Sequence, residues 1–206
     1  MRRRLRVRVA RAGSATIPSM RRRLLIAVSL VLTVALSVGL FNRAAAPVVD
    51  QGGVAVWFSP DGGCADAVID AVRSSNKTLE IAAYHITHAG IAKAIVDANR
   101  RRVSVRVVMD ASQAQSKYSS ATFLHNAGVH VMIWQGALMH HKFVIVDGKQ
   151  LITGSFNFTK AADESNAENL LIIRDKPRVI AAYRQQFSRL VQKSRRYTPP
   201  KTDGPE

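Results

Sequence analysis

The sequence predicts an α/β fold in which a mixed, mostly parallel β-sheet carries helices on both faces, preceded by an N-terminal hydrophobic helix. Three observations lead to this prediction. From residue 54 onward, apolar strand-like runs alternate with segments of helical periodicity, as in strand–helix–strand units. Asp147-Gly148, between two apolar runs, is a hairpin signal that makes part of the sheet antiparallel. Residues 24–41 form an uncharged apolar run directly after three arginines.

Each expected element follows from local periodicity and from the turn residues beside it. We expect strands, as short apolar runs, at 54–58, 78–84, 103–109, 129–134, 142–147, 150–153 and 169–174. We expect helices where apolar residues recur every three or four positions, at 65–72, 91–98 and 177–191, and a polar helix at 112–127. These elements define one domain at 47–194. The Pro- and charge-rich residues 195–206 predict a flexible tail.

Composition and charge exclude several classes of protein. Of the 206 residues, 47% are hydrophobic and 21% are charged, which excludes a disordered or collagen-like chain. The single cysteine, Cys64, excludes an internal disulfide framework and a cysteine-based zinc site. The net charge is +16, but ten arginines lie before residue 47, and residues 47–206 keep a charge of +6. That remainder suits a polyanion or an anionic surface as partner without requiring one.

Residues 1–46 read as an Arg-rich leader containing a signal peptide or a membrane anchor. The apolar run 24–41 spans about 27 Å as a helix, long for a cleaved signal and short for a transmembrane helix. Ala44-Ala45-Ala46 offers a cleavage site, but Pro47 would follow the cut, so cleavage and retention both stay open. Met20 is an alternative start. In each case we expect an exported domain, periplasmic or extracellular, or anchored to the outer face of the cytoplasmic membrane.

The residues that carry chemistry lie between His140 and Glu168. Side chains alternate along a strand, so His140 and Lys142 are expected to share one face, with His141 on the other. Ser155 and Asn157 again share one side, and Glu168 begins the next strand. The set offers one base or nucleophile, one cation, two neutral hydrogen-bonding groups and one carboxylate. Such a set suits a tetrahedral anion such as a phosphodiester.

The spacing His140-x-Lys142-xxxx-Asp147-xxxxxx-Gly154-Ser155 resembles the HKD motif of the phospholipase D superfamily. The extension 154–162 together with Glu168 resembles the small single-motif bacterial nucleases and the mitochondrial cardiolipin hydrolase-like proteins. The resemblance covers about 54–191 and implies the phospholipase D/nuclease fold. It also implies phosphodiester hydrolysis with no cofactor and no metal.

The resemblance also implies a role for each residue. His140 would attack phosphorus and form a phosphohistidine, while Lys142 and Asn157 would hold the nonbridging oxygens. Glu168, supported by Ser155, would accept a hydrogen bond from the other ring nitrogen of His140. Asp147, at the third motif position, is mainly structural in this family.

The chain contains the motif once, whereas the chemistry needs two histidines facing one phosphate. Single-motif members solve this with a homodimer whose site lies on the two-fold axis, so a homodimer with a shared active site is expected. His85, just past a strand, is a candidate for substrate binding, although a role in a surface loop explains it equally well.

Three functions remain open. The first is a metal-independent endonuclease that recognises the backbone of DNA or RNA. The second is a phospholipase D that binds phospholipid head groups and releases phosphatidic acid, with membrane anchorage bringing the site near lipid. The third is a nucleic-acid-binding or scaffold protein with a silent site, which ranks last because every catalytic residue type is present.

Overall fold

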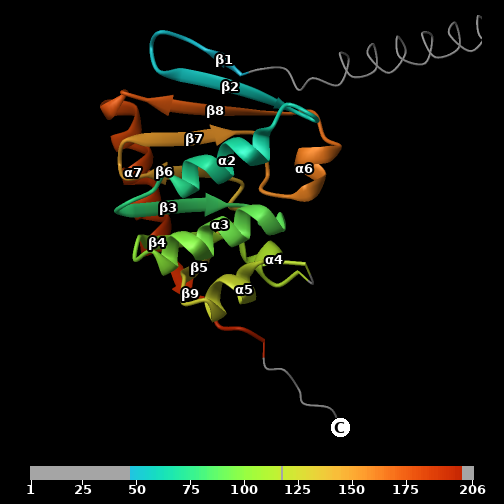
Figure 1. The fold of residues 1–206 in the computed structure, drawn as a ribbon. Helices are drawn as coiled ribbons and strands as arrows, with labels where there is room; N and C mark the ends of the chain where they lie inside the picture. Colours follow the sequence, from blue (N-terminus) through green and yellow to red (C-terminus); the bar gives the residue numbers. More distant parts are fainter. Residues whose placement is uncertain (1–46, 117, 201–206) are drawn as a thin grey trace, which may run out of the picture. The chain divides into compact units, whose positions relative to one another are not determined.

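The centre of the molecule is one β-sheet. The structure, a computed structural model, describes residues 47–116 and 118–200, so the expected N-terminal hydrophobic helix lies outside the described residues. Nine described strands follow the order β1-β2-β8-β7-β6-β3-β4-β5-β9 (Figure 1). Their bounds are Val48–Val49 (β1), Val54–Ser59 (β2), Thr78–Ala83 (β3), Ser104–Met109 (β4), His130–Trp134 (β5), Lys142–Val146 (β6), Gln150–Gly154 (β7), Glu168–Arg174 (β8) and Ser194–Arg196 (β9).

The sheet is mixed, as expected, but it is not mostly parallel. Only β3–β4 and β4–β5 pair in parallel, and the six other described pairings are antiparallel. The chain passes from β3 to β4 through the segment 84–103, and from β4 to β5 through the segment 110–129. Both segments contain helices and are long enough to return the chain to the start of a parallel strand. The expected hairpin at Asp147-Gly148 is confirmed, since both residues adopt positive φ angles, 52° and 64°, between β6 and β7.

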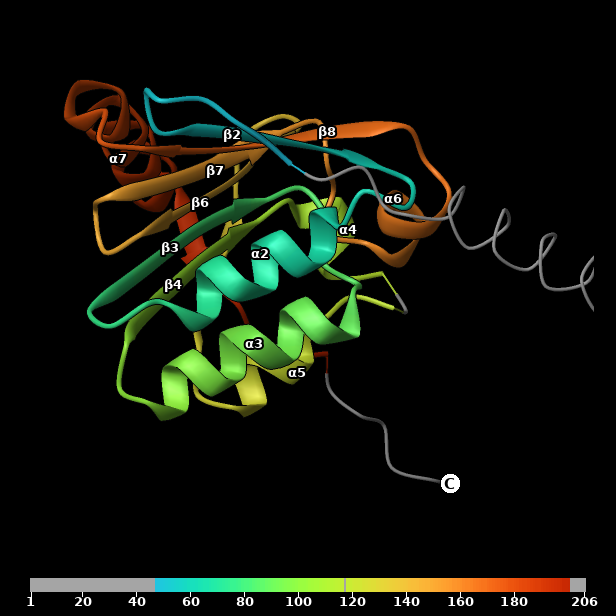
Figure 2. The ribbon, with the colours of Figure 1, turned by 45° about the horizontal axis from the view of Figure 1, so that its top comes forward.

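Helices cover both faces of the sheet, which confirms the expected layers. Figure 2 shows α2, α3 and α5 together on one face, with α7 on the opposite side. The bounds of the described helices are Cys64–Arg73 (α2), Ala89–Arg100 (α3), Ala111–Ala114 (α4), Ala121–Asn126 (α5), Lys160–Glu164 (α6) and Pro177–Gln192 (α7).

The hydrophobic core is divided by the sheet into two layers, because side chains alternate along each strand. On β3, Leu79 and Ile81 pack toward α2 and α3, whereas Ala82 packs toward α7. Helix α7 contributes Ile180, Phe187 and Leu190 to the second layer. The central strands are buried on both faces and therefore hold the loops at their ends rigidly in place.

Two expected elements differ in extent. The polar helix expected at 112–127 is divided into α4 and α5, because the serine-rich stretch between them favours turns over helix. The first residues of the expected flexible tail, 195–206, are ordered instead, and residues 201–206 lie outside the described residues. Ser194–Arg196 forms β9 against β5, and Tyr197 is buried with its hydroxyl 2.8 Å from that of Thr122.

None of the helices within 47–116 and 118–200 combines the length and apolarity that crossing a membrane needs. The apolar run 24–41, on which the anchor prediction depends, lies outside the described residues.

Candidate active site

Five of the sequence-predicted site residues lie at one end of the sheet: His140, Lys142, Ser155, Asn157 and Glu168. There β3 ends, β6 begins, β7 ends and β8 begins, because β6 and β8 run antiparallel to their neighbours. His140 precedes β6 and is exposed, while Lys142, the first residue of β6, is 8% exposed. Lys142 Nζ donates to the carbonyl oxygen of His140 over 2.9 Å. A reactive imidazole therefore stands in solvent beside an ammonium group that is largely withdrawn from it.

The alternation predicted for this strand is confirmed by its contacts. The ring of Tyr84, just after β3, lies against both the His140 ring (4.7 Å between centroids) and Lys142 Nζ (5.3 Å from the centroid). His141 instead stacks on Phe143, at 5.6 Å, and its Nε2 lies 3.4 Å from the side-chain amide of Gln186 on α7. His140 and Lys142 therefore share a side from which His141 is excluded.

Ser155 and Asn157 are held by the apolar residues between which they alternate. Phe156 and Phe158 are fully buried, which fixes the loop after β7 and turns the two polar side chains toward the sheet end. Asn157 Oδ1 is buried without a hydrogen-bond partner among the described residues. The Asn157 side-chain amide is therefore not fully satisfied within the described domain, and its Nδ2 is the group that can donate to a ligand oxygen.

A glycine is required where this loop leaves β7. A Cβ atom at Gly154 would lie 2.2 Å from the carbonyl oxygen of Asn169, far inside contact distance. The close approach lets Asn169 O accept from the backbone N–H of Ser155 at 3.1 Å. Gly154 thus fixes the loop against the start of β8.

Glu168 is tied to this loop. Ser155 Oγ donates to Glu168 Oε2 over 2.6 Å, and Asn166 Nδ2 donates to Oε1 over 3.3 Å. The hydrogen bond from Ser155 to Glu168 is consistent with the supporting role expected for Ser155. Among the described residues no hydrogen bond joins Glu168 to His140, so the expected Glu168–His140 interaction stays a prediction.

The electrostatics of the site centre on Lys142. Burial lowers the pKa of its ammonium group, and the nearby Glu168 carboxylate opposes that shift. A partly desolvated cation interacts more strongly with a charged ligand than one in free solvent. Lys142 is therefore suited to offset the negative charge of a phosphate.

Asp147 lies at the opposite end of β6. Its carboxylate accepts from the backbone N–H groups of Asn76, Lys77 and Thr78, over 2.7 to 3.2 Å, at the start of β3. Burial acts to raise the pKa of Asp147, but these donors outweigh it and lower the pKa. Asp147 therefore fastens two strands together, which agrees with the structural role that the resemblance implies.

His85 lies at the same end of the sheet as His140. Its Nε2 is 3.4 Å from Ser116 Oγ, its ring is 6.4 Å from that of Tyr84, and burial lowers its pKa. His85 thus holds the loop after α4 through Ser116, and its expected contact with a substrate stays a prediction.

Sequence reasoning missed two residues that shape the site. Tyr84 was expected only as the end of a strand, yet it contacts both His140 and Lys142. Asp110 follows β4, is 3% exposed, and accepts from the backbone N–H of Met139 over 2.8 Å, which holds the segment leading into His140. An aspartate directly after a buried strand was the available signal for the second.

A groove passes beside His140, between the strand ends and α7. It consists of two adjoining cavities of about 330 and 360 Å³ that share His140, His141 and Gln186. Tyr183 lines one cavity, and Trp134 lines the other. The groove, here called the α7 groove, lies on the His141 side of the strand and includes His140 in its lining.

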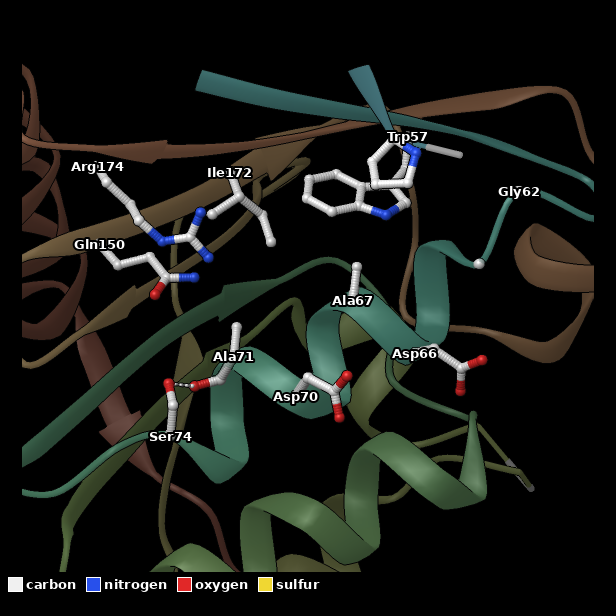
Figure 3. A pocket seen from close by; sticks show the side chains of 12 residues that line it. Trp57, Gly62, Asp66, Ala67, Asp70, Ala71, Ser74, Gln150, Ile172 and Arg174 are labelled. Atoms are coloured by element: carbon white, nitrogen blue, oxygen red, sulfur yellow. Dashed lines mark hydrogen bonds between the residues drawn. The ribbon is translucent and has the colours of Figure 1, made fainter. Parts of the chain in front are cut away.

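A larger cavity, of about 470 Å³, lies between α2 and the strands β2, β7 and β8. Figure 3 shows Trp57, Asp70 and Arg174 among its lining side chains. None of the sequence-predicted site residues lines it. Its lining combines carboxylates with an arginine and holds no histidine or lysine, so it lacks the imidazole and ammonium pair found at the sheet end and is not the candidate active site.

Within the described part of the chain, no group of three or more histidine, cysteine, aspartate or glutamate side chains is arranged to hold a metal ion. The residues at the sheet end instead offer a nucleophile, a cation and neutral donors.

An exposed histidine beside a buried lysine, on a mixed sheet with helices on both faces, defines a phosphodiesterase domain of the phospholipase D type. Residues 68–191 match the family described as "Cardiolipin synthase, PLD-like domain". The chain belongs to the phospholipase D superfamily.

Relatives carry different names within that superfamily. A "Phospholipase D" of Rickettsia typhi is 32% identical over 72% of this chain and 73% of its own length. A "Phospholipase D" of Rickettsia bellii is 37% identical over 59% of this chain, and the match spans 61% of that protein. A "Mitochondrial cardiolipin hydrolase" of Chlamydomonas reinhardtii is 37% identical over 59% of this chain and 55% of its own length.

Among solved structures, the phospholipase D family member Nuc from Salmonella typhimurium is similar with a TM-score of 0.68 and 32% identity. The similarity covers 71% of this chain and 98% of Nuc. The expected fold is thereby confirmed for the described domain.

Proposed function

We propose that this protein hydrolyses phosphodiester bonds through a phosphohistidine intermediate and acts as a metal-independent endonuclease. The observation that carries the proposal is the exposed imidazole of His140 beside the 8%-exposed Lys142. An exposed nucleophile next to a desolvated cation suits attack on a phosphate, because the cation offsets charge as it develops in the transition state.

In the proposed first step, a ring nitrogen of His140 forms a bond to phosphorus while the bond to the leaving oxygen breaks. An opposing imidazolium gives its proton to that oxygen, then takes a proton from water, which attacks phosphorus and releases His140. Lys142 and Asn157 Nδ2 hold the nonbridging oxygens, and this assignment is supported by the buried Asn157 amide, whose Oδ1 has no hydrogen-bond partner within the described domain.

The opposing imidazolium is proposed to be the partner's His140, in a homodimer with one shared site. The exposure of His140 at the rim of the sheet supports this arrangement, since a second copy can approach it. Light scattering of the full-length chain at the concentration of the activity assay tests it. A dimer whose specific activity falls on dilution is expected, and a fully active monomer overturns the shared site.

Nucleic acid is the substrate class that we propose, and phospholipid is the second candidate. The match to Nuc over 98% of that chain favours a nuclease. The names of the Rickettsia and Chlamydomonas relatives favour lipid, as do two exposed apolar side chains at the site's end of the sheet. These are Phe58, 60% exposed and paired with Asn169 on β8, and Leu138, 64% exposed and lining the α7 groove.

One panel tests the activity and ranks the substrates. The full-length chain with EDTA is incubated with single- and double-stranded DNA, RNA, and vesicles of phosphatidylcholine or cardiolipin. Cleavage of nucleic acid, lost in His140→Asn and kept in the matched control His130→Asn, supports the proposal; His130 is exposed at the far end of β5. Release of phosphatidic acid without cleavage of nucleic acid establishes the lipase instead.

We further propose that the domain is exported and that residues 1–46 direct or anchor it. The arginine-rich, then apolar, sequence supports this proposal. Fractionation of cells and digestion of intact spheroplasts with protease test it. A protein protected from protease and recovered with the cytoplasm contradicts export.

A further inference from the structure

The positive charge of the exported domain is concentrated in one short segment. Between residues 47 and 175, twelve basic residues are balanced by twelve acidic ones. The following 21 residues, 176–196, contain seven basic residues and no acidic residue. These seven, all exposed, are Lys176, Arg178, Arg184, Arg189, Lys193, Arg195 and Arg196. The excess charge of the domain therefore belongs to α7 and β9, not to the domain as a whole.

Three cations on and just after α7 lie along one side of the helix, whereas Arg184 projects from another side toward Glu80. Arg178 and Arg189 are eleven residues apart, about three turns, so they project in nearly the same direction, and Lys193 follows one turn later. Along the helix axis the three span roughly 22 Å. They form what we call the cationic stripe of α7.

The cationic stripe adjoins the α7 groove. Ala182 and Gln186, which line the groove, are one and two turns after Arg178, and Arg189 and Lys193 continue the same side beyond Gln186. The small side chain of Ala182 leaves this edge low between the charges. Because His140, Ala182 and Gln186 line the same groove, a ligand strand bound at His140 can continue along α7 toward the stripe.

These cations are not used within the described fold. Of the seven, Arg184 alone lies within 4 Å of a carboxylate of the described residues, Glu80, at 3.7 Å. On the opposite face, by contrast, the cations of α2 and α3 pair with neighbouring aspartates, as in Arg73–Asp70 and Lys93–Asp97. The stripe consequently carries an uncompensated field that attracts a polyanion.

We propose that the cationic stripe of α7 binds the backbone phosphates of a nucleic-acid strand whose reacting phosphate lies at His140. The proposal rests on the nuclease function proposed above and adds a second contact surface to it. A membrane fits the stripe less well. The large apolar side chains Ile180, Phe187 and Leu190 are already buried against the sheet, and Val179 is the one that α7 exposes, at 42%. The helix therefore has no free apolar face to insert into a lipid interface.

The test measures how binding depends on salt. Full-length chains in a His140→Ala background, which prevents cleavage, are titrated with a fluorescent single-stranded 30-nucleotide DNA. The stripe variant carries Arg178→Gln, Arg189→Gln and Lys193→Gln. Each lost phosphate contact lowers the slope of log K against log salt by about 0.7, so the three together lower it by about 2. Wild-type binding should then weaken about 20-fold more than that of the variant between 50 and 200 mM salt.

The matched control removes the same charge from the other face, as Arg73→Gln, Lys93→Gln and Arg100→Gln, whose side chains are 66 to 72% exposed. Equal slopes for the stripe and control variants overturn the stripe, because the effect then follows net charge alone. A slope changed only by the stripe variant supports it.

Two further arms separate the stripe from the nuclease proposal. With His140 intact, both triple variants are assayed on bis(4-nitrophenyl) phosphate, which is too short to reach α7, and on the 30-nucleotide DNA. A higher KM for DNA alone, in the stripe variant alone, supports the proposal. DNA cleavage with the same KM in both variants overturns the stripe and leaves the nuclease standing. Cleavage of the small ester but of no DNA refutes the nuclease itself. Stripe-dependent binding to phosphatidylglycerol vesicles, with DNA binding unchanged, assigns the stripe to a membrane and overturns the proposal.

Discussion

Replacing Asp147 should destabilise the fold while leaving the chemistry at the other end of β6 in place. Asp147 Oδ1 accepts from the backbone N–H groups of Asn76, Lys77 and Thr78, and Oδ2 accepts from Asn76 as well. Losing all three donors costs about 3 kcal/mol, at about 1 kcal/mol per hydrogen bond for partly hydrated groups. Asp147 also has a φ of 52°, which adds about 1 kcal/mol of strain for alanine and none for glycine.

The free energy of unfolding should therefore fall by about 4 kcal/mol in Asp147→Ala, by about 3 in Asp147→Gly and by about 1 in Asp147→Asn, which loses only the Oδ2 contact. For a domain of this size, Asp147→Ala corresponds to a decrease in Tm of roughly 8 to 16 °C. Urea titration followed by circular dichroism measures all three variants.

The pH dependence follows from the lowered pKa of Asp147. A carboxylate whose pKa is lower in the folded state than in the unfolded state stabilises the fold fully above the unfolded value, and this stability is lost as pH falls through the folded value. The difference between wild type and Asp147→Ala should be complete at neutral pH and shrink below about pH 4. Loss of kcat at a temperature where the variant is fully folded, without a loss of stability, would falsify this account.

Three further predictions concern other parts of the domain. Burial lowers the pKa of Lys142 and Glu168 opposes that shift, so activity should fall at a lower alkaline pH than the pKa of an ordinary lysine would give. Glu168→Gln should move this alkaline limb of the pH–rate profile to still lower pH, and an unmoved limb contradicts the interaction of Glu168 with Lys142. Burial raises the pKa of the Cys64 thiol to about 11, so iodoacetamide at pH 8 should label it only after unfolding. Mass spectrometry measures the labelling, and rapid labelling of the native protein would contradict the burial of this thiol. Phe187 packs between Phe143 and the guanidinium of Arg106, so Phe187→Ala should lower the free energy of unfolding by about 3 to 5 kcal/mol. A decrease below about 1 kcal/mol, measured by chemical denaturation, would contradict its place in the core.

Local pattern was enough to predict what single strands and turns determine. The side shared by His140 and Lys142 follows from strand alternation, and the β6–β7 hairpin follows from Asp147-Gly148. Neighbours along the chain determine both features, so no knowledge of the sheet order was needed.

What escaped prediction depends on which strands lie side by side. Strand β8 lies between β2 and β7 and is antiparallel to both, which no short motif signals, and the sheet was therefore expected to be mostly parallel. The contacts of Tyr84 with His140, and of Asp110 with Met139, likewise join segments far apart in sequence. β9 was missed because three polar residues carry no strand periodicity and are ordered by pairing with β5.

The 2.2 Å separation between a hypothetical Cβ at Gly154 and Asn169 O gives this position diagnostic value when sequences of relatives are compared. Any larger residue there must push the two backbones apart, and the 2.6 Å contact from Ser155 to Glu168 spans the same gap. In a relative that lacks glycine at the equivalent position, the hydrogen bond from Ser155 to Glu168 should be lost, even if the histidine and lysine are preserved. The residue at this position therefore shows, from sequence alone, whether the Ser155–Glu168 contact can form.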